Sequence, residues 1–196
     1  MGKGLWLKQR LQATAPARLA IWDRNDEYHD QARQVASLAA FAGLVGKPAF
    51  AARYVPRGRT RKDLAAEFET WCLIAYELVG ATLVVEELAD VTTASFAPPA
   101  WRQLNTRGRH HQGLTLYWCS QSPAMVDKAA LTNATHLHIG FLGTHAHRVA
   151  VAREINASPE VIDQLEQFEW LEYERSKKAT SSGRVAPPRR RAARSS

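Results

Sequence analysis

The chain has 196 residues, of which 45% are hydrophobic, and its 26 basic and 19 acidic side chains give a formal net charge of +7. This length is typical of one domain with a sizeable core. Because the sequence has no apolar run of about 18 residues, no signal-peptide pattern and only two cysteines, Cys72 and Cys119, it favours a soluble protein of the reducing cytosol over a membrane, secreted or disulfide-stapled class.

The positive charge is concentrated at the C-terminal end. From Arg175 onward there are eight basic residues and no acidic one, so residues 1–174 carry 18 basic and 19 acidic side chains, a balance of −1. We expect residues 1–174 to form the folded domain and residues 175–196 to be a disordered basic tail. Such a tail either holds a phosphate backbone or only increases solubility.

The chain opens with Gly2, Lys3 and Gly4, followed by leucines at helical spacing. A Gly-Lys pair before a helix is typical of the second half of a phosphate-binding loop, where N–H groups and a lysine meet phosphates at the positive end of the helix dipole. The full pattern, G-x-x-x-x-G-K-[ST], needs an earlier glycine and a strand before it, and Gly4 stands where Ser or Thr helps to hold Mg²⁺. An ordinary frayed chain start is the alternative.

Strands and helices alternate over residues 18–90, which is the pattern of a parallel α/β sheet. A basic loop over residues 56–62 carries four cations and is either a solvated turn or a surface facing DNA or another subunit. The expected strands span residues 18–23, 49–55 and 82–85, and the expected helices span residues 30–44 and 63–79.

Two adjacent carboxylates, Glu86 and Glu87, follow the strand over residues 82–85. This strand is apolar without alternation, which is typical of burial on both faces. Ligands of open α/β sheets bind at the carboxyl ends of the strands, so the pair lies where chemistry is expected. In a nucleotide hydrolase, the first would hold Mg²⁺ and the second would polarise the attacking water. A solvent-facing acidic turn is the alternative.

The second half of the chain continues the alternation. A short helix is expected near residues 101–105. Arg107 and Arg109 then precede a buried strand over residues 114–119, and Gln121 follows it at the same expected edge as the two glutamates. The amide can sense a γ-phosphate or orient water, or it can merely make a hydrogen bond at the end of the strand. His110 and His111 lack further ligands at metal-binding spacing and predict a polar turn.

Three helices and one more strand are expected beyond Gln121. The last helix is capped by Ser158 and continues through residue 178. The expected helices span residues 125–131, 145–155 and 158–178, and the expected strand spans residues 136–142.

These motifs together resemble the FtsK/HerA branch of the P-loop motor ATPases, and within it the viral DNA-packaging ATPases and the Zot-like proteins of filamentous phages. The resemblance covers roughly residues 2–155. Gly2-Lys3 resembles the end of Walker A, RLAIWD with Asp26-Glu27-Tyr28 resembles the second strand and its D-x-x-x-E-[YF] sequel, and LVVEE resembles Walker B. The most specific match is RGRHHQGLTLYWCSQSPAMVDKAAL followed by THLHIGF, which is similar to the family's R-G-R-x-x-G, S/T-Q-x-P and V-D-x-x-x-L series.

The resemblance implies an α/β fold of the RecA-like, ASCE P-loop class, with a mostly parallel sheet flanked by helices. It implies ATP and Mg²⁺ as cofactors, with Gly2, Lys3 and Gly4 at the nucleotide. By the same match, Glu86 is the metal ligand and Glu87 the catalytic carboxylate.

The remaining roles implied by the resemblance concern catalysis between subunits. Gln121 would be the polar sensor, and Arg107 or Arg109 the arginine finger delivered to a neighbouring subunit's nucleotide. Since a finger supplied in trans makes hydrolysis depend on assembly, the resemblance implies a homo-oligomeric ring, expected to be a hexamer, with double-stranded DNA through its centre.

The function implied is an ATP-driven DNA translocase for viral genome packaging, acting in the host cytoplasm and at the packaging vertex beside capsid or portal proteins. One alternative is a Zot-like phage assembly or secretion ATPase, although those proteins usually carry a transmembrane segment. The other is a P-loop-derived subunit that no longer hydrolyses ATP and only binds DNA or assembles.

The sequence departs from the family pattern in two places. Glu86 replaces the more usual Asp of Walker B, which lengthens the reach by one methylene. The front of Walker A and its strand are missing, and because that strand lies inside the sheet, its absence leaves two unpaired inner edges. We therefore expect the natural start to lie roughly 20 to 30 residues upstream, unless another segment fills the slot.

Overall fold

The computed structural model describes residues 3–186 and contains two sheets. The larger has five parallel strands in the order β2-β3-β1-β4-β5, so β1 lies at its centre. The smaller has three antiparallel strands in the order β6-β7-β8. The strands of the larger sheet are β1 (Arg18–Trp22), β2 (Arg33–Gln34), β3 (Phe50–Tyr54), β4 (Thr82–Val85) and β5 (Thr115–Trp118), and those of the smaller are β6 (His136–Gly140), β7 (Glu169–Glu174) and β8 (Ala179–Arg184).

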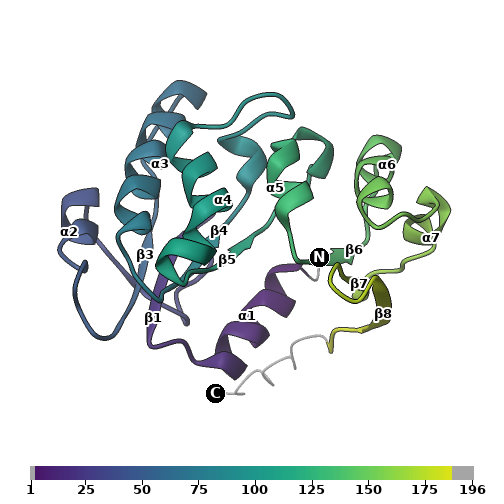
Figure 1. The fold of residues 1–196 in the computed structure, drawn as a ribbon, viewed down its shortest axis with the longest axis horizontal. Helices are drawn as coiled ribbons and strands as arrows, with labels where there is room; N and C mark the ends of the chain where they lie inside the picture. Colours follow the sequence, from purple (N-terminus) through teal and green to yellow (C-terminus); the bar gives the residue numbers. More distant parts are fainter. Residues whose placement is uncertain (1–2, 187–196) are drawn as a thin grey trace, which may run out of the picture.

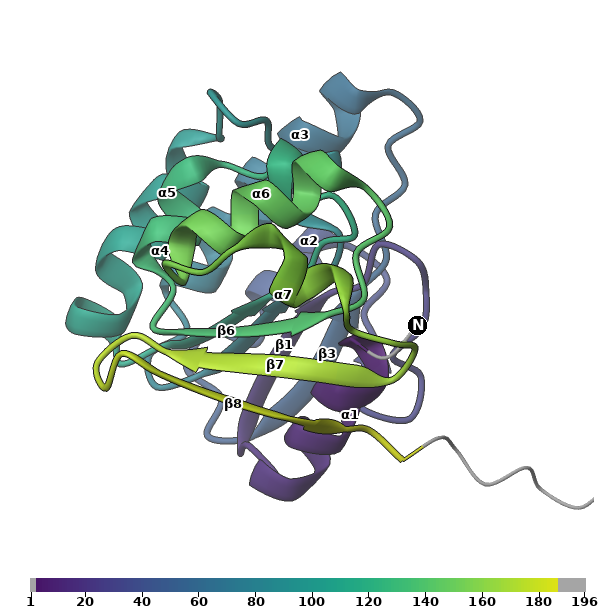
Figure 2. The same cartoon turned by 90° about the vertical axis from the view of Figure 1, so that its right-hand side faces the viewer.

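Helices cover both faces of these sheets, with α1 on one side and the other α-helices on the opposite side (Figures 1 and 2). The α-helices are α1 (Lys3–Thr14), α2 (Leu38–Ala42), α3 (Arg61–Tyr76), α4 (Pro99–Gln112), α5 (Lys128–Asn133), α6 (His145–Glu154) and α7 (Pro159–Asp163), and two short 3₁₀ helices are η1 (Leu88–Asp90) and η2 (Pro123–Met125). Within residues 3–186, no helix has the length and apolarity that a bilayer crossing requires.

Side-chain alternation along the strands explains the two layers. On β1, Ile21 packs with Leu7 and Leu11 of α1, whereas Trp22 packs on the other face against Phe68 and neighbouring residues of α3. Successive side chains of a strand point to opposite faces, so a strand covered on both sides is apolar throughout. The buried α/β sheet predicted from the sequence is therefore confirmed.

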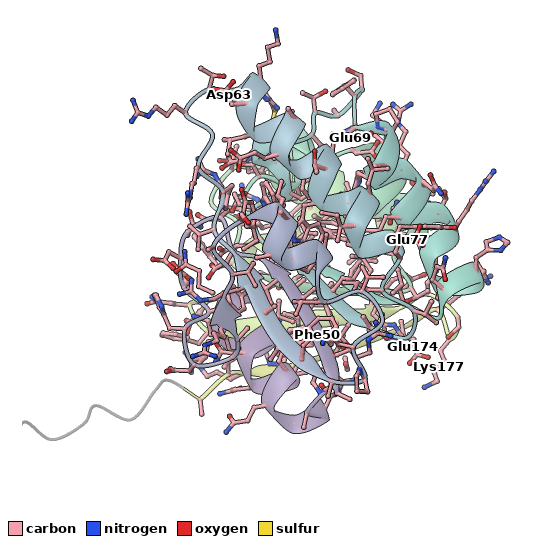
Figure 3. The ribbon with its side chains drawn as sticks, turned by 90° about the vertical axis from the view of Figure 1, so that its left-hand side faces the viewer. Phe50, Asp63, Glu69, Glu77, Glu174 and Lys177 are labelled. Atoms are coloured by element: carbon pink, nitrogen blue, oxygen red, sulfur yellow. The ribbon has the colours of Figure 1, made fainter. Side chains whose placement is uncertain are left out.

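Helix α3 begins at a capping box. The Thr60 hydroxyl accepts the Asp63 N–H at 3.1 Å, and the Asp63 carboxylate accepts the Thr60 N–H at 3.1 Å. These bonds satisfy N–H groups that the first helical turn leaves free. Figure 3 shows Asp63 and Glu77 at opposite ends of this helix. The helix therefore runs along the sheet from one end of the strands to the other.

The smaller sheet continues the layer beyond β5 but does not pair with it. Within the described residues, no strand bonds to the second edge of β5 or of β6. A cavity of about 810 Å³ lies between these edges, lined by most of both strands together with Trp6 and Arg10 of α1 and Leu104 and Leu131 of the opposite layer. We call it the β5–β6 groove. Within the described residues no strand lies in this groove, and the strand expected upstream of the chain stays a prediction.

Three expected helices differ from the structure. The helix expected over residues 30–44 is replaced by the short β2 and by α2, and the one expected over residues 158–178 is replaced by α7 and the strand β7. The short helix expected before the basic segment instead continues through Arg107 and Arg109 to the end of α4.

The start of the expected disordered tail is also wrong, because residues 179–184 form β8. Leu171 and Tyr173 of β7 are buried, while Glu172 and Glu174 alternate with them, and this period of two favours a strand over a helix. β8 pairs along the whole of β7. Residues 187–196 lie outside the described part of the chain.

An aromatic stack joins α1 to the smaller sheet. The Trp6 ring lies 4.0 Å from that of His138 at an interplanar angle of 15°, and the His138 ring lies 5.3 Å from that of Trp170. Trp170 in turn covers Gly183, where a Cβ atom would stand 2.5 Å from the indole. Burial lowers the pKa of His138 to about 4.

This stack predicts a pH dependence of stability that His138→Phe should remove. Because the folded-state pKa of about 4 lies below the ordinary value of 6.5, the neutral ring stabilises the fold above pH 6.5, and this contribution is lost as the pH falls toward 4. Between pH 7 and pH 4, the wild-type free energy of unfolding should fall by on the order of 2 kcal/mol relative to His138→Phe in urea titrations. Parallel curves for the two proteins would contradict this.

Candidate functional site

The carboxyl ends of β4 and β5 lie side by side, because Val85 pairs with Trp118. The Gln121 N–H donates to both carboxylate oxygens of Glu87, at 3.0 and 3.3 Å, and the Ser120 hydroxyl donates to one of them at 2.9 Å. The expected meeting of Glu87 and Gln121 at one sheet edge is therefore observed.

The backbone of Glu87 turns sharply where β4 ends. Its φ of 48° and ψ of 61° lie in the left-handed region, which is uncommon for a residue other than glycine. The turn leads into η1 and directs the carboxylate toward β5. Backbone strain of this kind is concentrated at functional sites and persists only where surrounding contacts hold it.

Glu86 faces the opposite direction, toward β1. It is only 8% exposed, and its carboxylate accepts the Asn25 N–H at 3.0 Å. Burial, together with the nearby carboxylates of Asp23 and Glu27, raises the pKa of Glu86 to about 7, against the Asn25 bond that lowers it. The two adjacent glutamates thus occupy different environments, as two different chemical roles require.

Glu86 also meets the requirements for a magnesium ligand. Within residues 3–186, no group of three or more His, Cys, Asp or Glu side chains is arranged to enclose a metal. Mg²⁺ in nucleotide sites uses one or two carboxylates plus phosphate oxygens and water, so a closed protein cage is not needed. A divalent cation beside Glu86 would favour the ionised carboxylate against the burial and the carboxylate repulsion that raise its pKa.

A hollow of about 430 Å³ lies at this edge, and it is open to solvent. Arg61, from the start of α3, reaches over it and donates to the carbonyl of Thr92 at 2.5 Å. Arg61 belongs to the basic loop identified in the sequence, but its place beside Glu87 was not expected. The hollow is lined by Asn25, Arg61, Glu87, Ala89, Asp90, Gln121, Ser122 and Met125.

The start of α1 also points to this edge. α1 packs on the sheet and is followed at once by β1, so it runs antiparallel to the strands (Figure 1). Its N-terminus therefore lies toward the strands' carboxyl ends, where N–H groups favour anions. Lys3 is its first residue, Gly4 lies in its first turn with open space around it, and Gly2 lies outside the described residues.

The two candidate arginines do not line the hollow beside Glu87. Arg107 and Arg109 are exposed on the second half of α4, which ends at Gln112 and is capped by Gly113. Within the described residues, neither arginine lines the hollow or makes a hydrogen bond to Glu87. His110 and His111, expected in a polar turn, lie in the last turn of α4.

Comparison with known proteins identifies a sequence relative. The chain is 31% identical to protein P9 of Pseudoalteromonas phage PM2 over 171 residues, which cover 85% of this chain and 76% of P9. No protein-family model matches.

Solved structures share the fold. The genome packaging NTPase B204 of Sulfolobus turreted icosahedral virus 2, in complex with sulfate, superposes with a TM-score of 0.73 at 17% identity, covering 93% of this chain and 88% of B204. The DNA-packaging ATPase B204 of Sulfolobus turreted icosahedral virus gives 0.71 at 18% identity, covering 95% and 93%. The expected P-loop NTPase fold, a mostly parallel sheet flanked by helices, is confirmed.

The environment of Glu86 predicts how stability depends on pH without nucleotide or metal. Because its folded-state pKa of about 7 lies above the ordinary 4.5, the protonated group stabilises the fold below pH 4.5, and this contribution is lost as the pH rises through 7. The free energy of unfolding of Glu86→Gln minus that of wild type should therefore increase by on the order of 1–3 kcal/mol as the pH rises from 5 to 8.

Urea titrations in EDTA measure this difference. The matched control is Glu77→Gln, which removes an exposed carboxylate at the far end of α3 (Figure 3). An unfolding free energy for Glu86→Gln that runs parallel to wild type across this pH range would show that Glu86 is not held in a buried, repulsive environment.

Proposed function

The chain belongs to the family of protein P9 of Pseudoalteromonas phage PM2, and we propose that it is an ATPase that drives double-stranded DNA into a viral capsid. The observation that carries the proposal is the pair of adjacent carboxylates at one sheet edge, Glu86 buried toward β1 and Glu87 held by the turn after β5. The fold shared with the packaging NTPases supports it.

Each carboxylate has a separate task in this proposal. ATP lies at the start of α1, whose N–H groups and Lys3 meet its phosphates. Glu86 holds Mg²⁺, which neutralises phosphate charge when bound. Glu87 orients the attacking water and accepts its proton. Ser120 and the Gln121 N–H hold mainly one Glu87 oxygen, which leaves acceptor capacity on the other.

Gln121 and the arginines complete the catalytic set. The exposed Gln121 side chain stands beside Glu87, where it senses the γ-phosphate. Arg107 or Arg109 acts on the nucleotide of a neighbouring subunit, since within the described residues neither lines the hollow beside the Glu87 of its own chain. Catalysis by such groups is mostly electrostatic, so a cation supplied in trans makes turnover depend on a ring, which we expect to be a hexamer around DNA.

The β5–β6 groove supports the further proposal that a strand upstream of α1 completes the sheet. Such a strand would pair with two free edges and end at the start of α1, where the front of the phosphate loop belongs. An apolar segment suits the groove because side chains line it from both layers. The second candidate function is a subunit that binds DNA or assembles without hydrolysing ATP.

Glu87→Gln should abolish DNA-stimulated ATP hydrolysis. Removing a group that orients water and accepts its proton costs about 10²–10⁴-fold in rate. Phosphate release should be measured with and without linear duplex DNA, on this chain and on one extended upstream by the proposed strand and phosphate loop, with Glu77→Gln as the control.

The two chains separate the candidate functions. Hydrolysis that appears only in the extended chain supports the upstream strand. Absence of hydrolysis in both chains would leave the non-hydrolysing subunit, and a fully active Glu87→Gln protein would overturn the assignment of the catalytic carboxylate.

Mixing subunits tests the arginine finger. In a ring, one Arg107→Ala or Arg109→Ala subunit disables its neighbour's site, so activity should fall more steeply than the fraction of variant subunits. The measurement is ATP turnover across mixing ratios, with Arg102→Ala on the same helix as the control. A linear decline for both variants would exclude action between subunits.

A further inference from the structure

We propose that Arg53 is a positioning residue for the nucleotide site, acting through the loop of residues 23–28 that follows β1. The inference rests on the proposed function and adds a residue outside every motif of the sequence. Arg53 lies on β3, so β1 stands between its strand and β4, which Glu86 follows. It is 5% exposed, which is rare for arginine unless it is paired.

The guanidinium group of Arg53 binds both ends of this loop. Its Nη1 donates to the Asp23 carboxylate at 3.0 Å and also to the Asp26 carboxylate. Its Nη2 lies 2.8 Å from Nδ1 of His29 and donates to Oε1 of Gln34 at 3.4 Å. A planar guanidinium has donors in a fixed fork, so it holds several acceptors in one geometry, which an ammonium group does not.

Asp23 passes this constraint to the loop backbone. The side chain is completely buried, and its two oxygens accept the N–H groups of Glu27 at 2.9 Å and Tyr28 at 3.1 Å. Asp26 has a left-handed φ of 56° between these anchors. The loop is therefore closed around the Asp23 carboxylate, and Arg53 pairs with this buried carboxylate at 3.0 Å.

The other side of the loop touches both parts of the proposed nucleotide site. The Asn25 N–H donates to Glu86 at 3.0 Å. Glu27 pairs with Lys8 of α1 at 4.0 Å, and the Lys8 ammonium lies 5.0 Å from the centre of the Tyr28 ring. One loop thus joins Glu86, the proposed metal ligand, to α1, the helix proposed to receive the phosphates. Arg53 binds that loop from the side of β3.

Two variants test this role without removing the buried charge. Arg53→Lys keeps a cation beside Asp23 but loses the fork. Asp26→Asn removes one carboxylate partner at a side chain that is 51% exposed, and asparagine tolerates the left-handed backbone. Arg33→Gln is the matched control, because it removes a cation from the neighbouring strand β2, where the side chain is exposed.

The readout is Mn²⁺ affinity, measured by electron paramagnetic resonance in the complex with a non-hydrolysable ATP analogue, on the upstream-extended chain if this chain does not bind the analogue. Thermal unfolding followed by circular dichroism confirms that each variant is folded. Residues that orient a metal ligand typically contribute 10–100-fold to affinity, so Arg53→Lys and Asp26→Asn should weaken Mn²⁺ binding by about 10-fold or more. Arg33→Gln should keep the wild-type affinity.

The outcomes separate this inference from the proposed function. Folded Arg53→Lys and Asp26→Asn proteins with wild-type Mn²⁺ affinity would overturn the positioning role and leave the ATPase proposal standing. Wild-type chains that bind neither the analogue nor Mn²⁺ in either length would overturn both.

Discussion

The parallel pairing of β4 between β1 and β5 is the constraint on which the site depends. β4 is a short buried strand, and its register with both neighbours places Glu86 beside the loop after β1 and Glu87 beside the turn after β5. Two residues adjacent in sequence thus receive opposite surroundings. A shift of one residue in register would exchange the faces of both side chains, so the separation of roles follows directly from the hydrogen-bonded ladder.

Much of this arrangement is predictable from the amino-acid sequence because it depends on local pattern. An apolar run without alternation indicates a buried strand, and the carboxyl ends of parallel strands share an edge, so these two rules are enough to place Glu87 and Gln121 together. Residues far from these motifs are not predictable in this way. Arg53 interrupts the apolar pattern of β3, and only its pairing with Asp23, at the end of the neighbouring strand β1, explains why a cation is buried there.

The misassigned elements share a different cause. β7 contains glutamates and leucine at spacings that also suit a helix. β8 is mostly polar and exposed, so it has no hydrophobic pattern that predicts a strand. Each becomes a strand through tertiary pairing, β7 with β6 and β8 with β7. Gly183 permits this pairing because the Trp170 indole occupies the space where a side chain would stand. Such long-range fits leave little trace in local propensity.

Contacts of side chains along α1 determine the position of this helix. Within the described residues, Leu7 and Leu11 pack on the larger sheet, Lys8 pairs with the loop that Arg53 holds, and Trp6 stacks on His138 of the smaller sheet. The β5–β6 groove separates these two sheets. A strand entering the groove would bond to both free edges and fix their separation, and because α1 contacts both sheets, the same event would fix the start of this helix.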